Sequence, residues 1–156
     1  MKPKLLHVYI RELLSEQSLQ SQGQEGLEER FSAFMSEYES MSEANPIGRP
    51  DDRYWYMGEV DGKHCLVMTN LDVWDGAIHL AAIQTLPASV CEGKGYASSV
   101  MNKIVALADK HQVPMTLDPM PFGQARLGMK ELVSWYKRAG FSPDYDRGGE
   151  WTRHPR

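Results

Sequence analysis

Two alternating runs joined by an Asp-Gly dipeptide constrain the fold of this chain more than any other feature. RYWYMGEV, residues 53–60, and KHCLVMT, residues 63–69, have the period of two that is typical of strands. Asp61-Gly62 stands between them and accepts the positive φ angles of a tight hairpin turn. A second such dipeptide, Asp75-Gly76, precedes the apolar run AIHLAAIQTL. The sequence therefore predicts three consecutive antiparallel strands.

Helical patterns surround these strands. Apolar residues at spacings of three and four predict a helix over 27–38, and LLHVYIRELL, residues 5–14, favours a second helix although it also alternates. After the strands we expect a helix over 95–111, a short strand over 113–118, a helix over 128–139 and extended segments near the C-terminus. This order predicts an α+β fold with a mixed, mostly antiparallel central sheet flanked by helices.

The composition is that of a single globular domain over residues 1–156, with 42% hydrophobic and 24% charged side chains. Cys65 and Cys91 provide neither a disulfide framework nor a metal-binding pair, and we expect Cys91 to be a structural thiol. The net charge of −4 argues against broad binding to nucleic acid. No cleavage site of a signal peptide and no run of ~20 apolar residues is recognisable. We therefore expect a cytoplasmic protein without a metal or a membrane partner.

Gly93 and Gly95 lie in the segment EGKGYASSVM, whose remainder has the apolar stripe of a helix. Glycines let a ligand approach the backbone, and the N-terminus of a helix offers unpaired N–H groups to a phosphate. A purely structural turn explains the same glycines. A Walker A loop is excluded because Gly95, rather than Ser or Thr, follows Lys94. A Rossmann loop is a weaker match, because hairpins rather than a parallel first strand precede the glycines.

EGKGYA, residues 92–97, resembles the Gln/Arg-x-x-Gly-x-Gly/Ala motif of the GNAT superfamily of acetyl-CoA-dependent N-acetyltransferases. Further along, LVSWYKRAGF, residues 132–141, is similar to the second motif of that superfamily, in which an aromatic-Tyr pair precedes Gly-Phe. The two motifs agree in order and spacing. The resemblance covers residues 53–154, while residues 1–45 match only in being helical. It implies a GNAT-like fold and acetyl transfer from acetyl-CoA.

The resemblance also implies which residues hold acetyl-CoA. The pantetheine arm would pair with the end of a strand at Thr85 and Leu86, and the pyrophosphate would lie on the N–H groups of the glycine loop. Glu92 replaces the usual Gln or Arg, which places a carboxylate beside the expected pyrophosphate. We define the glycine loop by its implied coenzyme-binding residues: Glu92, Gly93, Lys94, Gly95, Tyr96, Ala97 and Ser98.

Direct attack of an amine on a thioester requires a neutral amine, a stabilised oxyanion and a proton for the departing thiolate. Tyr136 occupies the position of that acid in the family, and we expect its phenol to need little tuning; core packing is the alternative role. His79 is a candidate base, because imidazole titrates in the useful range, or a structural hydrogen-bonded residue. Asp118 would bind the amine or cap a loop.

The resemblance implies a primary amine as the acceptor, and both a small molecule and a protein lysine fit. A homodimer formed through the C-terminal edge strands is compatible with the predicted sheet. An alternative from another class is a GNAT-fold module that binds CoA or a protein partner without catalysis. Glu92 motivates that alternative.

Overall fold

The computed structural model describes residues 26–44, 49–119 and 128–156. The helix expected within residues 5–14 lies outside this part of the chain. The predicted α+β fold is confirmed: helices flank a seven-stranded sheet of order β1-β2-β3-β4-β5-β7-β6, in which β4 and β5 are parallel and all other neighbours are antiparallel. The strands are β1 Glu43–Ala44, β2 Asp52–Val60, β3 Lys63–Trp74, β4 Ala77–Leu86, β5 Met115–Leu117, β6 Ser142–Pro143 and β7 Trp151–Arg153.

Both Asp-Gly dipeptides form the predicted hairpin turns. Asp61 and Gly62 have φ angles of 51° and 77°, and Asp75 and Gly76 have φ angles of 50° and 75°. Two consecutive positive φ angles match the right-handed twist of the flanking strands, which is why these turns connect β2 to β3 and β3 to β4. The three consecutive antiparallel strands predicted from the sequence are confirmed.

The helices are the N-terminal helix, residues 26–41, then α2 Ala88–Cys91, α3 Tyr96–His111 and α4 Met129–Arg138, followed by the short 3₁₀ helix η1 Tyr145–Arg147. The helices predicted over 95–111 and 128–139 are thus present with nearly the expected bounds. In contrast, α2 was not predicted, because four residues are too few for a helical period to show. Among the described residues no helix has the length and apolar character needed to cross a membrane.

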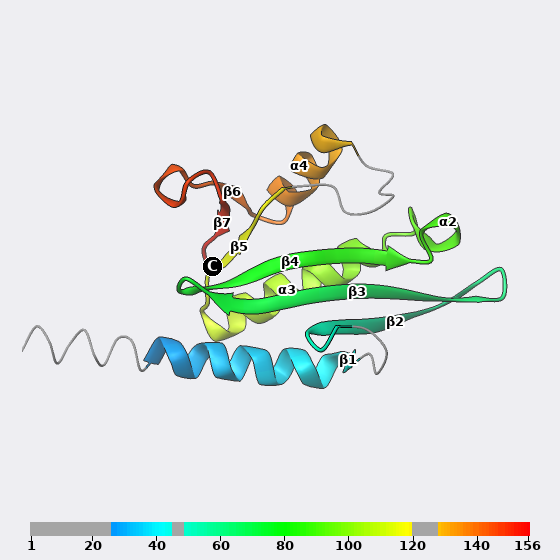
Figure 1. Ribbon diagram of the computed structural model, residues 1–156, viewed down its shortest axis with the longest axis horizontal. Coiled ribbons are helices and arrows are strands. Elements are labelled where there is room, and N and C mark those ends of the chain that lie inside the picture. The colour runs from blue at the N-terminus through cyan, green and yellow to red at the C-terminus, as the bar shows by residue number, and fades with distance from the viewer. Residues whose placement is uncertain (1–25, 45–48, 120–127) are drawn as a thin grey trace, which may run out of the picture.

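The N-terminal helix and α3 pack on the same face of the sheet. The Tyr38 hydroxyl lies 2.6 Å from Thr69 Oγ1 on β3, and the Trp55 indole of β2 donates to that same oxygen at 3.1 Å. The C-terminal end of α3 approaches the N-terminal helix (Figure 1). Glu37 joins the two helices through Lys110 and His111. The buried stripe of α3 completes this core with Val100, Met101, Ile104, Leu107 and Ala108.

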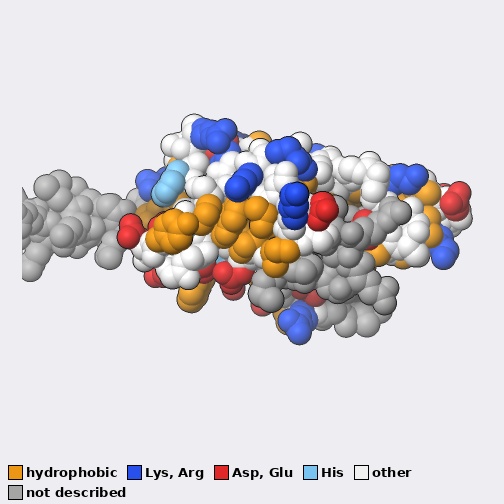
Figure 2. All heavy atoms as spheres, turned by 90° about the horizontal axis from the view of Figure 1, so that it is seen from above, with side chains coloured by type: hydrophobic (Ala, Val, Ile, Leu, Met, Phe, Trp, Pro, Cys, Tyr) orange, Lys and Arg blue, Asp and Glu red, His pale blue; other side chains and the backbone are white. Residues whose placement is uncertain are grey.

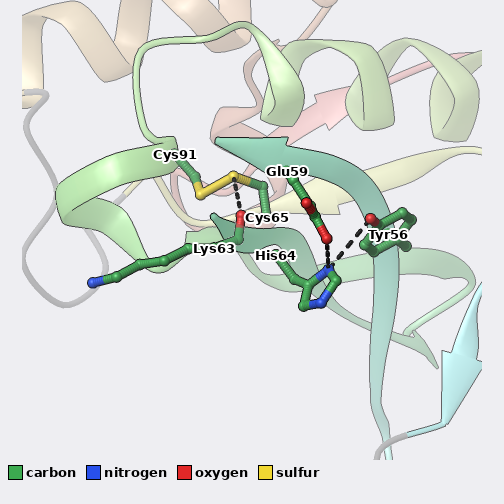
Figure 3. Close-up of a disulfide and its surroundings, with 6 residues drawn as sticks. All are labelled: Tyr56, Glu59, Lys63, His64, Cys65 and Cys91. Carbon is green, nitrogen blue, oxygen red and sulfur yellow. Dashed lines mark hydrogen bonds and ion pairs between the residues drawn. A yellow bond between two sulfur atoms is a disulfide. The ribbon is translucent and has the colours of Figure 1, made fainter. Parts of the chain in front are cut away.

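A disulfide joins Cys65 to Cys91, which corrects the expectation of a free structural thiol. The bond connects β3 to the last residue of α2, with the two Cα atoms 5.7 Å apart, and both side chains are fully buried (Figure 3). The two positions are 26 residues apart in the sequence. They meet because the β3–β4 hairpin runs out and back, so that the start of β3 lies beside the end of β4.

Candidate active site

The main feature of the candidate site is the part of β4 beyond Leu80, called the opening below, where β4 no longer pairs with its parallel neighbour β5. These parallel strands pair only up to Leu80 and Leu117, although β4 continues to Leu86. The register with β3 moves from Leu71–Leu80 to Asn70–Ala82, so Ala81 is an additional residue in β4. Such a bulge bends a strand. Beyond it β4 has no partner on its β5 side within the described residues, and the two strands diverge (Figure 1).

Thr85 and Leu86, the residues expected to pair with the pantetheine arm, lie at the end of this diverging part of β4. Thr85 is buried and Leu86 is half-buried. The strand does not run directly into the glycine loop, because α2 is inserted after it. α2 thus occupies most of the segment between Leu86 and Glu92. The exposed residues Gly93 to Gly95 follow it and lead into the start of α3.

The glycine loop has a backbone conformation that depends on its two glycines. Gly93 and Gly95 have φ angles of 83° and 80°, a region that residues with a side chain rarely adopt. Gly95 is the N-cap of α3 and provides no side-chain hydrogen bond to it, so the first N–H groups of the helix keep their capacity to donate. No atom lies within 4 Å of the position that a Cβ on Gly95 would occupy. The backbone of Gly95 is therefore open on that side.

Other residues of the loop differ in exposure. Lys94 is exposed, whereas Glu92, Tyr96 and Ala97 are half-buried, and Tyr96 and Ala97 pack against the hydrophobic core. The Glu92 carboxylate is the one feature of the loop that opposes phosphate binding by its charge.

Trp135 links the first turn of α3 to α4. Its indole Nε1 donates to Ser98 Oγ at 2.8 Å. Because an indole can only donate, the Ser98 oxygen is the acceptor and its own hydroxyl proton remains available for another partner. Ser98 was predicted as a coenzyme-binding residue, but its contact with Trp135 was not. This contact holds α4, and with it Tyr136, at the N-terminal end of α3.

Tyr136 is deeply buried. Its side chain is 1% exposed, and its ring contacts Trp135 and Phe141. Burial raises the pKa of Tyr136 to about 12, and no described residue forms a hydrogen bond with its hydroxyl. The hydroxyl is therefore held protonated, and it gives up its proton less readily than an exposed tyrosine would.

His79 lies just before the opening, on β4, and faces away from the helices. Its neighbours in the strand, Ile78 and Leu80, are in the helix-covered core, so the His79 side chain points to the opposite face. Its Nδ1 lies 3.0 Å from Thr116 Oγ1 and 4.0 Å from a Glu150 carboxylate oxygen. The Thr116 contact fits the structural role of His79 that the sequence left open.

The structure brings the expected site residues together only in part. Asp118 follows β5 directly and is exposed at the edge of the opening. His79 and Tyr136 belong to opposite faces of the sheet and have no contact with each other among the described interactions. Sequence reasoning did not identify Glu150, whose carboxylate reaches His79 only because β7 lies next to β5 in the sheet. Within the described part of the chain no three His, Cys, Asp or Glu side chains are placed to hold a metal ion.

No protein-family model matches the chain, and no curated protein matches it. Among solved structures, the crystal structure of the anti-CRISPR protein AcrVA5 is similar to part of it. That likeness has a TM-score of 0.44 and 13% sequence identity, and it covers 56% of this chain and 87% of the other. A likeness of this extent identifies no function, so the case for function depends on the site itself.

Proposed function

We propose that the protein transfers an acetyl group from acetyl-CoA to a primary amine. The observation that carries the proposal is the opening beside β4, which leads from the bulge at Ala81 to the exposed glycine loop. An unpaired strand edge offers amide groups to the two amides of pantetheine, and an uncapped helix start offers N–H groups to a pyrophosphate. The two recognition elements occur in the order that the coenzyme needs.

On the face seen from above in Figure 1, hydrophobic side chains form an exposed area with Lys and Arg side chains along one side and Asp and Glu side chains at other parts of its border (Figure 2).

In the proposed reaction the neutral amine nitrogen attacks the thioester carbonyl and forms a C–N bond. The C–S bond then breaks, the amine loses a proton to solvent or to a base, and the thiolate gains one. Because the pKa of Tyr136 is about 12 and that of an ordinary thiol is about 8.5, complete proton transfer from Tyr136 to the thiolate is unfavourable. We therefore assign to Tyr136 a hydrogen bond to the sulfur as charge develops on it, with water supplying the proton.

Ligand binding provides the first test. A ligand that binds only the folded protein at a hundredfold excess over its Kd stabilises it by about 2.7 kcal/mol, which raises Tm measurably. We expect a Tm increase with acetyl-CoA and none with NADH or ATP. An increase with NADH alone would favour the dinucleotide-loop interpretation, and no increase with acetyl-CoA would contradict the proposal.

The variant Tyr136→Phe tests whether the protein is an enzyme or a module that binds acetyl-CoA without catalysis. We expect the variant to retain acetyl-CoA affinity and to lose about tenfold or more of its turnover on a polyamine or a lysine-bearing peptide, since one hydrogen bond to a charged group contributes about 1.5–3 kcal/mol. Tyr145→Phe is the matched control, because Tyr145 is 86% exposed and lies outside the site. Binding without turnover in the wild-type protein would favour the non-catalytic module, for which the Glu92 carboxylate is the supporting observation.

A further inference from the structure

The disulfide between Cys65 and Cys91 ends one residue before the glycine loop. We propose that this disulfide is a positioning device that holds the loop in its coenzyme-binding conformation, so that its oxidised state sets the affinity for acetyl-CoA. The inference rests on the proposed function of the loop. Figure 3 shows the bond passing from β3 to α2, beside the β2–β3 hairpin.

Burial along the connection from β4 to α3 identifies Cys91 as its anchor. Between Thr85 and Val100, Cys91 is the one residue that is buried, and the residues that follow it, Gly93 to Gly95, are exposed. Cys91 is therefore the buried point of this connection before α3, whose first turn packs against the core through Tyr96 and Ala97. Because the sulfur of Cys91 is bonded to Cys65 near the start of β3, that point is held covalently.

The backbone hydrogen bonds of α2 lie within its own turn. α2 has only four residues and no side-chain cap at its N-terminus. Its backbone hydrogen bonds run back to Pro87 and Ala88, so they order the turn but do not attach it to the sheet. Two glycines in the loop enlarge the number of conformations open to the unattached chain. A loop that must be ordered on binding loses affinity compared with one that is already ordered.

Reduction of the bond by a dithiol is the reaction that releases the loop. One thiolate of dithiothreitol attacks a protein sulfur and displaces the other, which takes up a proton. The second thiol of the reagent then closes the mixed disulfide, giving cyclic oxidised dithiothreitol and two protein thiols. Two electrons and two protons pass to the protein. Side-chain atoms are retained, so reduction changes the attachment of the loop with little change in core volume.

The test compares oxidised and reduced protein by calorimetric titration with acetyl-CoA, with thiol alkylation and mass spectrometry to count free cysteines. We expect reduction to raise Kd by about tenfold, which corresponds to about 1.4 kcal/mol. In the enzyme assay this appears as a higher KM for acetyl-CoA with kcat unchanged, whereas general destabilisation would lower the apparent kcat and leave KM unchanged. The double variant Cys65→Ala/Cys91→Ala should bind as weakly as reduced protein and should not respond to dithiothreitol.

Hydrogen exchange of the unliganded protein tests the attachment independently of the coenzyme. We expect the amides of residues 92–99 to exchange faster after reduction, while those of β3 and β4 stay protected. Equal Kd values and equal exchange in the two states would overturn the inference, as would two free thiols in protein purified without reductant. If acetyl-CoA binds neither state, the proposed function fails; faster exchange would then still support the attachment of the loop but not its role in acetyl-CoA binding.

Discussion

Arg153 and Asp109 form a two-pronged ion pair, with Nη1–Oδ1 and Nη2–Oδ2 distances of 2.7 and 2.9 Å. Arg153 also donates from Nε to the carbonyl of Ala139 at 2.9 Å. Its side chain is buried, with 4% of its surface exposed. A single guanidinium on β7 thus joins the C-terminal end of α3 to the end of α4. The relative position of these two helices, which carry the glycine-loop helix start and Tyr136, depends on this contact.

Asp109→Asn should lower the free energy of unfolding by about 2 kcal/mol, because a hydrogen-bonded charge is removed from a buried guanidinium. For a domain of this size we expect a Tm decrease of about 4–8 °C in thermal unfolding at pH 7. Asp146→Asn on η1 is a surface control that should leave Tm nearly unchanged. An equal Tm for wild type and Asp109→Asn would show that Arg153 gains all its stabilisation from Ala139.

Glu37→Gln should destabilise the protein more at pH 7 than at pH 3. Hydrogen bonds from Lys110 and then from His111 hold the pKa of Glu37 below its usual 4.5. A lowered folded-state pKa gives stability that is present above the unfolded pKa and is lost as the pH falls through the folded pKa. Urea unfolding at the two pH values measures the difference. An effect of the same size at pH 3 would mean that the contact depends on shape rather than charge.

Two buried tyrosines should make the protein sensitive to alkali. Burial raises the pKa of Tyr38 and of Tyr136 to about 12, from an unfolded value of about 10. Because the folded pKa is raised, their contribution is complete below pH 10 and decreases as the pH rises from there through 12. We expect urea unfolding to show falling stability above pH 10, and Tyr136→Phe to reduce that fall. A curve unchanged by this substitution would contradict the raised pKa.

Trp135→Phe should weaken acetyl-CoA binding through Ser98. The substitution keeps an aromatic ring but removes the indole donor to Ser98 Oγ. One neutral hydrogen bond contributes about 1 kcal/mol, so we expect KM for acetyl-CoA to rise about fivefold with a smaller change in kcat. Ser98→Ala should have a similar effect, and the double variant should be little worse than either single variant. Strict additivity would mean that the two residues act independently.

The elements specified by local chemistry were predictable from sequence. The two Asp-Gly turns, the helices over 95–111 and 128–139 and the short strand before Asp118 all follow from turn chemistry or apolar spacing. The bulge at Ala81 was not predictable, because AIHLAAIQTL has no glycine or other local signal to mark the additional residue. α2 was missed for its length.

Contacts between distant segments could not be predicted. The bond between Cys65 and Cys91 depends on the register of β3 with β4, and the approach of Glu150 to His79 depends on β7 joining the sheet beside β5. The sequence suggested Ser98 and Tyr136 individually, but the hydrogen bond that links their helices is donated by Trp135, and no local pattern indicates that contact. The roles of His79, Asp118 and the glycine loop in catalysis and binding stay predictions.

The outermost strands of the sheet bear on the state of the protein in solution. β6 has two residues, one of which is Pro143, and β1 at the opposite edge also has two. Proline has no N–H to donate, and so short an edge gives an incoming strand few partners. A second copy that extended the sheet through β6 would gain little, which argues against the edge-strand homodimer. Concentrated samples should accordingly resist strand-to-strand polymerisation at these edges.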